Sequence, residues 1–163
     1  MLSSDAPEVR AFWEKACSEM GIDPTSTYHA ATFGDPKFFD EVDEITELAL
    51  EGQKQATSHL EIDFEVNNIT RRAEGDYWLM LDKSLAPRGI VQLTTVKSTP
   101  FNEIDDEYAA IEGEGDSSLR HWKEVHEDYF KLQLNAWGRG DEWSEDLPVV
   151  CEIFTLVYPP LNK

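Results

Sequence analysis

Hydrophobic residues recur at spacings of three and four in three long segments, the pattern of helices that bury one face. These segments predict helices over residues 7–20, 36–51 and 118–137, with the glycines that follow as helix ends. A shorter acidic helix is predicted over residues 102–110. The residues expected to cap the three long helices are Ser4 or Asp5, Asp35, and Asp116 or Ser117.

Four other segments are short, rich in apolar and β-branched residues, and bounded by turn residues, which predicts strands. They cover residues 28–33, 77–81, 90–96 and 148–158, and the last is apolar on both faces, as in a central strand. Residues 60–66 alternate apolar with polar, which permits another strand. Strands and helices do not alternate as in a parallel sheet, so the pattern indicates an α+β fold or a barrel with helices.

The composition indicates one globular domain with a strong negative charge. The chain has 163 residues, 40% of them hydrophobic, which excludes a disordered protein. Its 33 acidic and 14 basic residues give a formal charge of −19. That charge repels nucleic-acid polymers unless the basic residues cluster on one face.

Cysteine spacing and hydropathy indicate which kind of globular protein this is. Cys17 and Cys151 lie in apolar segments, with no spacing typical of zinc, so both are expected to be buried free thiols. No apolar run is long enough to span a membrane, and the first residues do not resemble a signal peptide. We therefore expect a cytoplasmic protein without a membrane partner.

The segment 52–58 places a lysine and a threonine three residues apart where a helix gives way to a strand. Gly52 is expected to end the helix, and Lys54 and Thr57 follow it. Such junctions often carry function. The alternative is that Lys54 has a structural role, because a lysine just past a helix end also interacts favourably with the negative end of the helix dipole.

A second unusual stretch, residues 112–116, alternates glycine with three carboxylates. It lacks the lysine of a phosphate-binding loop, and its acidic spacing is not that of an EF-hand. Two interpretations of this stretch stay open. It could bind Mg²⁺ opportunistically, or it could be a simple loop in which Asp116 caps the following helix.

The histidines give no metal-binding signature, and no nucleophilic serine motif is present. His126 shares a helical stripe with Trp122 and Tyr129. That position favours a hydrogen-bonded core histidine over a catalytic base.

An ordered set of short motifs resembles the ASCH domain, a family of the PUA-like superfold. The resemblance covers residues 28–158 and rests on Gly52-x-Lys54-x-x-Thr57 after an acidic helix, Phe33-Gly34, Gly75-Asp76-Tyr77, Thr94-Thr95-Val96 with Pro100-Phe101, Glu112-Gly-Glu-Gly-Asp116 with Ser118-Leu119, Trp122 and His126, and Val150-Cys151-Glu152-x-Phe154. It implies a small β-barrel of five or six strands with flanking helices. Residues 1–27 would then form an extra N-terminal helix with its connector, residues 159–163 a tail, and residues 60–66 an irregular linker.

The resemblance also implies an RNA-related function. Some family members are similar to ribonucleases, and shorter ones are amidohydrolases that remove the acetyl group of N(4)-acetylcytidine with a lysine, a threonine and a glutamate. These correspond to Lys54, Thr57 and either Glu112, which the preceding helix favours, or Glu114, expected on a solvated turn. No metal or cofactor is implied. The residues expected to bind substrate are Phe33, Gly34, Gly52, Ser58, Arg71, Arg72, Arg88 and Asp116.

The leading hypothesis is therefore a metal-independent hydrolase that acts on RNA or on a modified nucleoside. For such chemistry the pKa of Lys54 would have to lie well below its usual range. The alternatives are a non-catalytic RNA-binding or regulatory module and an acidic interaction protein. A basic strip around Lys54 would favour polymeric RNA as the substrate. A closed pocket would favour a nucleoside, and a featureless acidic face would favour the interaction protein.

Overall fold

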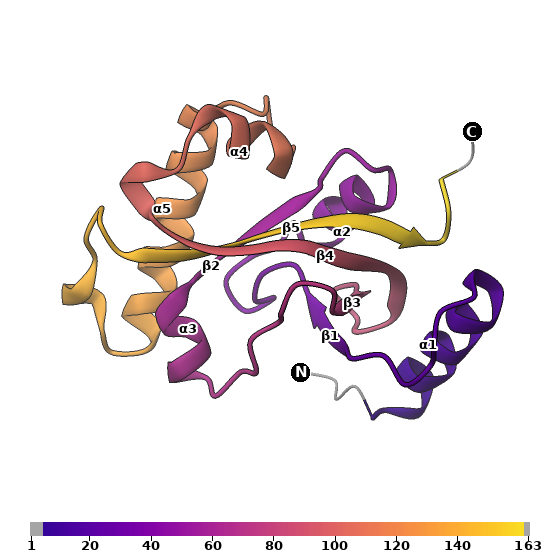
Figure 1. The fold of residues 1–163 in the computed structure, drawn as a ribbon. Helices are drawn as coiled ribbons and strands as arrows, with labels where there is room; N and C mark the ends of the chain where they lie inside the picture. The colour runs from indigo at the N-terminus through magenta and orange to yellow at the C-terminus, as the bar shows by residue number, and fades with distance from the viewer. Residues whose placement is uncertain (1–4, 162–163) are drawn as a thin grey trace.

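A curled sheet of five strands forms the centre of the protein (Figure 1). The computed structural model describes residues 5–161. The strands are β1 (Tyr28–Thr32), β2 (Ala56–Leu60), β3 (Tyr77–Leu81), β4 (Pro87–Pro100) and β5 (Pro148–Tyr158), in the order β1-β3-β4-β5-β2. Only β1 and β3 pair in parallel among these strands. This half-barrel with flanking helices confirms the expected α+β, PUA-like fold.

The long antiparallel pair β4 and β5 carries most of the sheet. Its register shifts twice, between Ile90 and Val91 and between Leu93 and Thr95, and such irregularities bend and twist a strand. β5 lies between β4 and β2, as its apolar residues on both faces predicted. The curl leaves β1 and β2 as the two edges of the sheet.

Helices cover both ends of the sheet. They are α1 (Pro7–Met20), α2 (Val42–Leu50), α3 (Glu61–Val66), α4 (Asp106–Glu112) and α5 (Leu119–Ala136), with short 3-10 helices at Phe101–Glu103 and Gly140–Glu142. In Figure 1, α1 lies near the end of β5, and α4 and α5 lie near its beginning. None of the helices within residues 5–161 is long and apolar enough to cross a membrane.

The N-terminal helix packs into the hydrophobic core. Its buried residues Val9 and Trp13 contact the cluster that contains Leu79 and Ile90, and Trp13 stacks on Tyr28 with ring centroids 4.5 Å apart. The domain boundaries expected near residues 28 and 158 stay predictions. Residues 162 and 163 of the expected tail lie outside the described part of the chain.

Three local expectations were wrong. Residues 61–66 form helix α3 rather than a strand or an irregular linker, because Phe64 turns into the protein while the polar residues around it stay more accessible. The helix expected from residue 36 begins only at Val42, after a turn that Asp35 caps through Lys37 N. Helix α5 is capped by Ser118, whose hydroxyl accepts from His121 N.

The first helix has no side-chain cap within the described residues, because Ala6 occupies the capping position. Ser4, one of the two expected caps, lies outside the described residues. Gly21 ends this helix in the left-handed conformation, as expected.

Candidate functional site

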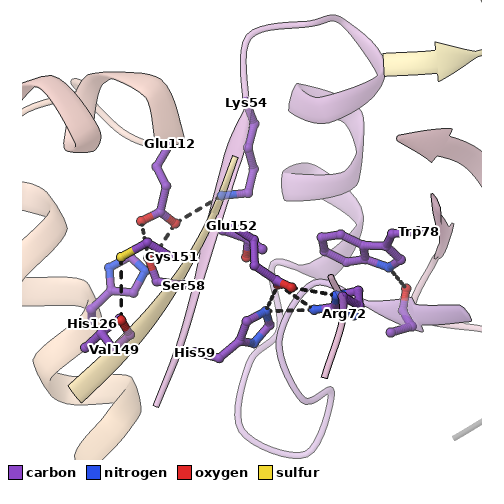
Figure 2. A network of polar contacts seen from close by, with 12 residues as sticks. Lys54, Ser58, His59, Arg72, Trp78, Glu112, His126, Val149, Cys151 and Glu152 are labelled. Atoms are coloured by element: carbon purple, nitrogen blue, oxygen red, sulfur yellow. Dashed lines mark hydrogen bonds and ion pairs between the residues drawn. The ribbon is translucent and has the colours of Figure 1, made fainter. Parts of the chain in front are cut away.

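Lys54 is a fully buried charge of the candidate site. It follows α2 in the segment that leads into β2, and only 1% of its side chain is exposed. Its ammonium lies 3.2 Å from Glu112 Oε1 and 2.7 Å from Glu114 Oε2 (Figure 2 shows the Glu112 contact). The lysine and the two candidate glutamates of the sequence analysis therefore meet in one buried cluster.

Backbone hydrogen bonds fix the segment that carries Lys54. Gly52 leaves α2 with φ +81°, and the N–H groups of Gln53 and Lys54 both donate to Leu48 O at 3.0 Å. Gln55 then connects two distant elements, since its N–H donates to Ile111 O and its carbonyl accepts from Phe154 N. The segment is thus held to α2, α4 and β5 before the strand begins.

Glu112 ends α4 with its carboxylate surrounded by donors. Oε2 accepts from Ser58 Oγ at 2.8 Å and from Trp122 Nε1, and Oε1 faces Lys54 and His126 Nε2, the latter at 3.4 Å. Burial by itself raises the pKa of Glu112, but the charges of His126 and Lys54 outweigh it and hold this pKa well below its usual range. Glu112 is therefore held as an anion at the centre of the site.

Two glycines direct the second carboxylate toward the same lysine. Gly113 ends α4 in the left-handed conformation, with φ +68°, and Gly115 has φ +58°. Glu114 between them keeps 16% of its side chain exposed and bonds Lys54, so the expectation of a solvated turn was wrong. Only Lys54 bonds this carboxylate within the described residues, which leaves acceptor capacity for a ligand.

Lys54 is held in its charged form. Burial lowers the pKa of Lys54, but the charges of Glu112 and Glu114 and their hydrogen bonds outweigh burial and raise it above its usual range. Lys54 therefore does not have the lowered pKa that a base or nucleophile would need, because burial comes with two carboxylates. Lys54 is a cation and a proton donor.

An open pocket lies over this cluster. Phe33 and Gly34, just after β1, line one side, and Thr57 and Ser58 of the opposite edge strand line another. Helix α5 and the segment around α2 complete the wall. The other lining residues are Phe39, Ile45, Lys54, Glu112, Glu114, Val125, His126 and Tyr129.

Thr57, like Ser58, lines the pocket. Its side chain is largely buried, yet no group within residues 5–161 hydrogen-bonds to Thr57 Oγ. By contrast, Ser58 Oγ is occupied by Glu112 Oε2 and Tyr108 OH. Thr57 is thus a hydroxyl that a ligand can engage without breaking an internal bond.

The three expected arginines do not line this pocket. Arg72 is buried in a separate network in which Glu152 binds Arg72 and His59, on the other side of the β2–β5 pair (Figure 2). Arg71 lies at the surface and pairs with Glu61, and Arg88 pairs with Glu47 and Asp82. No basic strip therefore surrounds Lys54 within the described residues.

Two further expected residues have structural roles here. Asp116 is exposed and accepts from Ser118 N at 2.9 Å, next to the cap of α5. Gly52 turns the chain out of α2 near Leu161 and does not line the pocket.

The carboxylates and His126 also have the chemistry of a metal site. One ligand atom each from Glu112, Glu114 and His126 lies within 4.8 Å of the others. The Lys54 ammonium already contacts both carboxylates, however, and supplies the cation that these carboxylates require. The donor set therefore fits a lysine better than an added ion.

Several pocket residues were missed by sequence reasoning. His126 makes the hydrogen bond expected of a core histidine, to Trp122 O, but it also lines the pocket and pairs with Glu112. Tyr129 lies one turn later on α5, and its hydroxyl accepts from Asp35 N at 2.7 Å. The stripe of residues 122, 126 and 129 was visible in the sequence, but it indicates only a shared face, not what that face covers.

Comparisons with known proteins agree with this fold. The ASCH domain family model matches residues 29–158. The structure of an ASCH domain from Lactobacillus crispatus JV V101 is similar with a TM-score of 0.83 and 26% identity, covering 96% of this chain and 99% of that one. A protein from Enterococcus faecalis V583 is similar in fold, with a TM-score of 0.77, 24% identity and coverage of 92% and 88%. The search among curated proteins gave no match.

Replacing Gly113 by alanine is expected to destabilise the protein more than replacing Gly21. Both glycines end helices at almost the same left-handed φ, +68° and +70°, so each substitution should cost about 1–2 kcal/mol in backbone strain. A Cβ at Gly113 would also lie 2.4 Å from Gln53 O, whereas one at Gly21 meets nothing within 4 Å. Urea unfolding of both variants measures the difference, and equal losses would contradict the close approach.

Replacing Lys54 by methionine is expected to destabilise the fold strongly. The substitution leaves two carboxylates facing each other without their cation, and breaking a buried pair costs about 3–5 kcal/mol. Adding Glu112→Gln should recover part of this loss, since it removes one of the unpaired charges. Urea unfolding of the wild type, both single variants and the double variant gives the coupling; additive losses would show that the two residues act independently.

Proposed function

Because this chain belongs to the ASCH domain family, we propose that it is a hydrolase of the RNA-related kind, an amidohydrolase that acts on an N(4)-acylated cytidine. One observation carries the proposal: Thr57, whose hydroxyl has no hydrogen-bond partner within the described residues, lines the same pocket as Lys54 and Glu114. Amide hydrolysis needs a nucleophile, a proton acceptor and a proton donor, and these three residues offer them.

The walls of the pocket support a nucleoside as the substrate. Phe33, Phe39 and Tyr129 provide aromatic surface, and bases recognised outside a duplex commonly stack on such side chains. The polar groups gather around Lys54, where the acyl group would react.

The charge distribution argues against a long RNA chain. A polymer needs several cations along its backbone. Arg71, Arg72 and Arg88 are each paired with a carboxylate and lie outside the pocket lining, and the chain carries a net charge of −19. A neutral nucleoside or a short RNA end meets less of this repulsion.

In the first step of the proposed reaction, Thr57 Oγ attacks the acyl carbon and its proton passes to Glu114. The bond between that carbon and the leaving nitrogen breaks as the nitrogen takes a proton from the Lys54 ammonium. Glu114 then returns its proton to Lys54, which restores both charges and leaves an ester on Thr57. The products of this step are the free amine and the acyl-enzyme.

Water completes the cycle through the same two groups. It attacks the ester and gives a proton to Glu114, while the Thr57 oxygen leaves with a proton from Lys54. Lys54 begins each step as a charged proton donor, because Glu112 and Glu114 raise its pKa, and Glu114 recharges it afterwards. Glu112 keeps its charge throughout and holds the lysine in place.

Removing the Thr57 hydroxyl is expected to abolish turnover with little effect on folding. Thr57→Val keeps the side-chain shape, and the hydroxyl has no internal hydrogen bond to lose within the described residues. Thr57→Ser should retain activity as the matched control. The assay incubates each protein with N(4)-acetylcytidine and with total RNA and identifies products by mass spectrometry. Full turnover by Thr57→Val would exclude Thr57 as the nucleophile, and cleaved RNA instead of free amine would favour a ribonuclease.

The two glutamates are expected to separate by their effects. Glu114→Gln should lower kcat by about 10²–10⁴, the range for a positioned acid or base, with a modest loss of stability. Glu112→Gln should lower the free energy of unfolding more, because Glu112 contacts four donors and only 1% of its side chain is exposed. Rates and urea unfolding of both variants test this; a well-folded Glu114→Gln protein with full activity would contradict the proton transfer.

A further inference from the structure

His126 presents both ring nitrogens to groups that accept hydrogen bonds. Its Nδ1 lies 2.8 Å from the carbonyl oxygen of Trp122, and its Nε2 lies 3.4 Å from Glu112 Oε1. The ring stacks on Trp122 with centroids 4.2 Å apart and an interplanar angle of 17°, so it cannot turn easily. Only 12% of the side chain is exposed, at the wall of the pocket.

These partners determine the protonation of the ring. A carbonyl oxygen only accepts, so Nδ1 carries a proton. Glu112 also only accepts, because Lys54 and the donor Trp122 Nε1 hold it as an anion. A bare Nε2 would direct its lone pair at this carboxylate, which is repulsive at 3.4 Å. The contact is attractive only when His126 is an imidazolium.

The pocket floor is then a cluster of two cations and two anions. Lys54 and His126 face Glu112, and Glu114 pairs with Lys54. Other titratable groups near His126 are Tyr129, which lines the same pocket, and His121, which lines a smaller adjoining cavity. The neighbouring ring of Phe130 carries no charge.

We propose that His126 is a positioning residue of the reaction centre: as an imidazolium it occupies Glu112, so that Lys54 stays shared between Glu112 and Glu114. When His126 loses its proton, the cluster carries one uncompensated negative charge, and Lys54 is drawn toward Glu112 and away from its exchange with Glu114. This inference rests on the proposed function, since it assigns His126 a role in that reaction.

The direction of the pH effect follows from the same contacts. Burial lowers the pKa of His126, but the charge of Glu112 outweighs burial and raises it above the ordinary histidine value. The stabilising contact is fully present below the unfolded-state pKa and is lost as pH rises through the higher folded-state pKa. Activity should therefore fall on the alkaline side, through an ionisation above that of an ordinary histidine.

Three variants separate this role from simple packing. His126→Gln keeps an N–H donor toward Glu112 but carries no charge and does not titrate, so at every pH its activity should lie near the alkaline level of the wild type, without an alkaline fall. His126→Leu removes the donor and should lower kcat by about 10²-fold, the cost of a small misplacement of reacting groups. His59→Gln changes the other buried histidine–carboxylate contact, which lies outside the pocket, and should keep the wild-type profile.

The rates are measured against pH with N(4)-acetylcytidine, and circular dichroism checks that each variant folds. A wild-type alkaline fall that persists in His126→Gln would overturn the positioning role while leaving the proposed function intact. A change of profile in His59→Gln as large as in His126→Gln would also overturn it, because the effect would then be general.

Imidazole NMR titration tests the charge state without any substrate. His126 should be protonated at pH 7 in the wild type, and Glu112→Gln should lower its pKa. A neutral His126 at pH 7 would overturn the inference whatever the enzyme assays show. If the folded wild-type protein hydrolyses no acylated cytidine, the proposed function is wrong, and so is the positioning role that depends on it. A protonated His126 in the NMR titration would still support the charged cluster in that case.

Discussion

The burial of Lys54 is the constraint on which the rest of the site depends. A charged amine removed from water is strongly unfavourable unless anions and hydrogen bonds replace the lost hydration. Glu112 and Glu114 supply this replacement, but only if α4 ends at residue 112 and the chain then turns sharply at Gly113. Glu112 in turn needs Ser58 from β2 and Trp122 from α5. One buried cation therefore sets the relative positions of four segments.

The curl of the sheet turns this cluster into a site. β1 and β2 are the two edges of the sheet, yet residues just after β1 and residues of β2 line the same pocket. A flat sheet would keep them three strands apart. The register shifts in β4, one of which lies opposite Ile153 and Phe154 of β5, contribute to this bend.

Much of the fold was predictable because its signals are local. The strands at residues 28–32, 77–81 and 148–158 follow from apolar patterns and turn residues. The helix at residues 61–66 was not predictable, because a six-residue segment with alternating polarity suits a short helix as well as a strand. The choice between them is made by the packing of Phe64, which depends on the tertiary structure.

The candidate site was likewise predictable only in part. Sequence motifs brought together Lys54, Thr57 and the two glutamates, but the pKa of Lys54 could not be read from them, because its direction depends on how many carboxylates accompany burial. The three arginines looked available in the sequence, and each pairs with a carboxylate that only the fold brings near it.

The groups of this pocket differ in how far the fold depends on them. Lys54, Glu112 and Glu114 compensate one another's charges in the protein interior, so a change in any of them affects the fold. Thr57 Oγ takes no part in that balance among the described residues. Groups left free in this way can form and break bonds with a ligand while the cluster beneath them keeps its geometry. In the proposed reaction Lys54 belongs to the cluster and also donates a proton, so Glu114 has to recharge it without the pocket being rebuilt at each cycle.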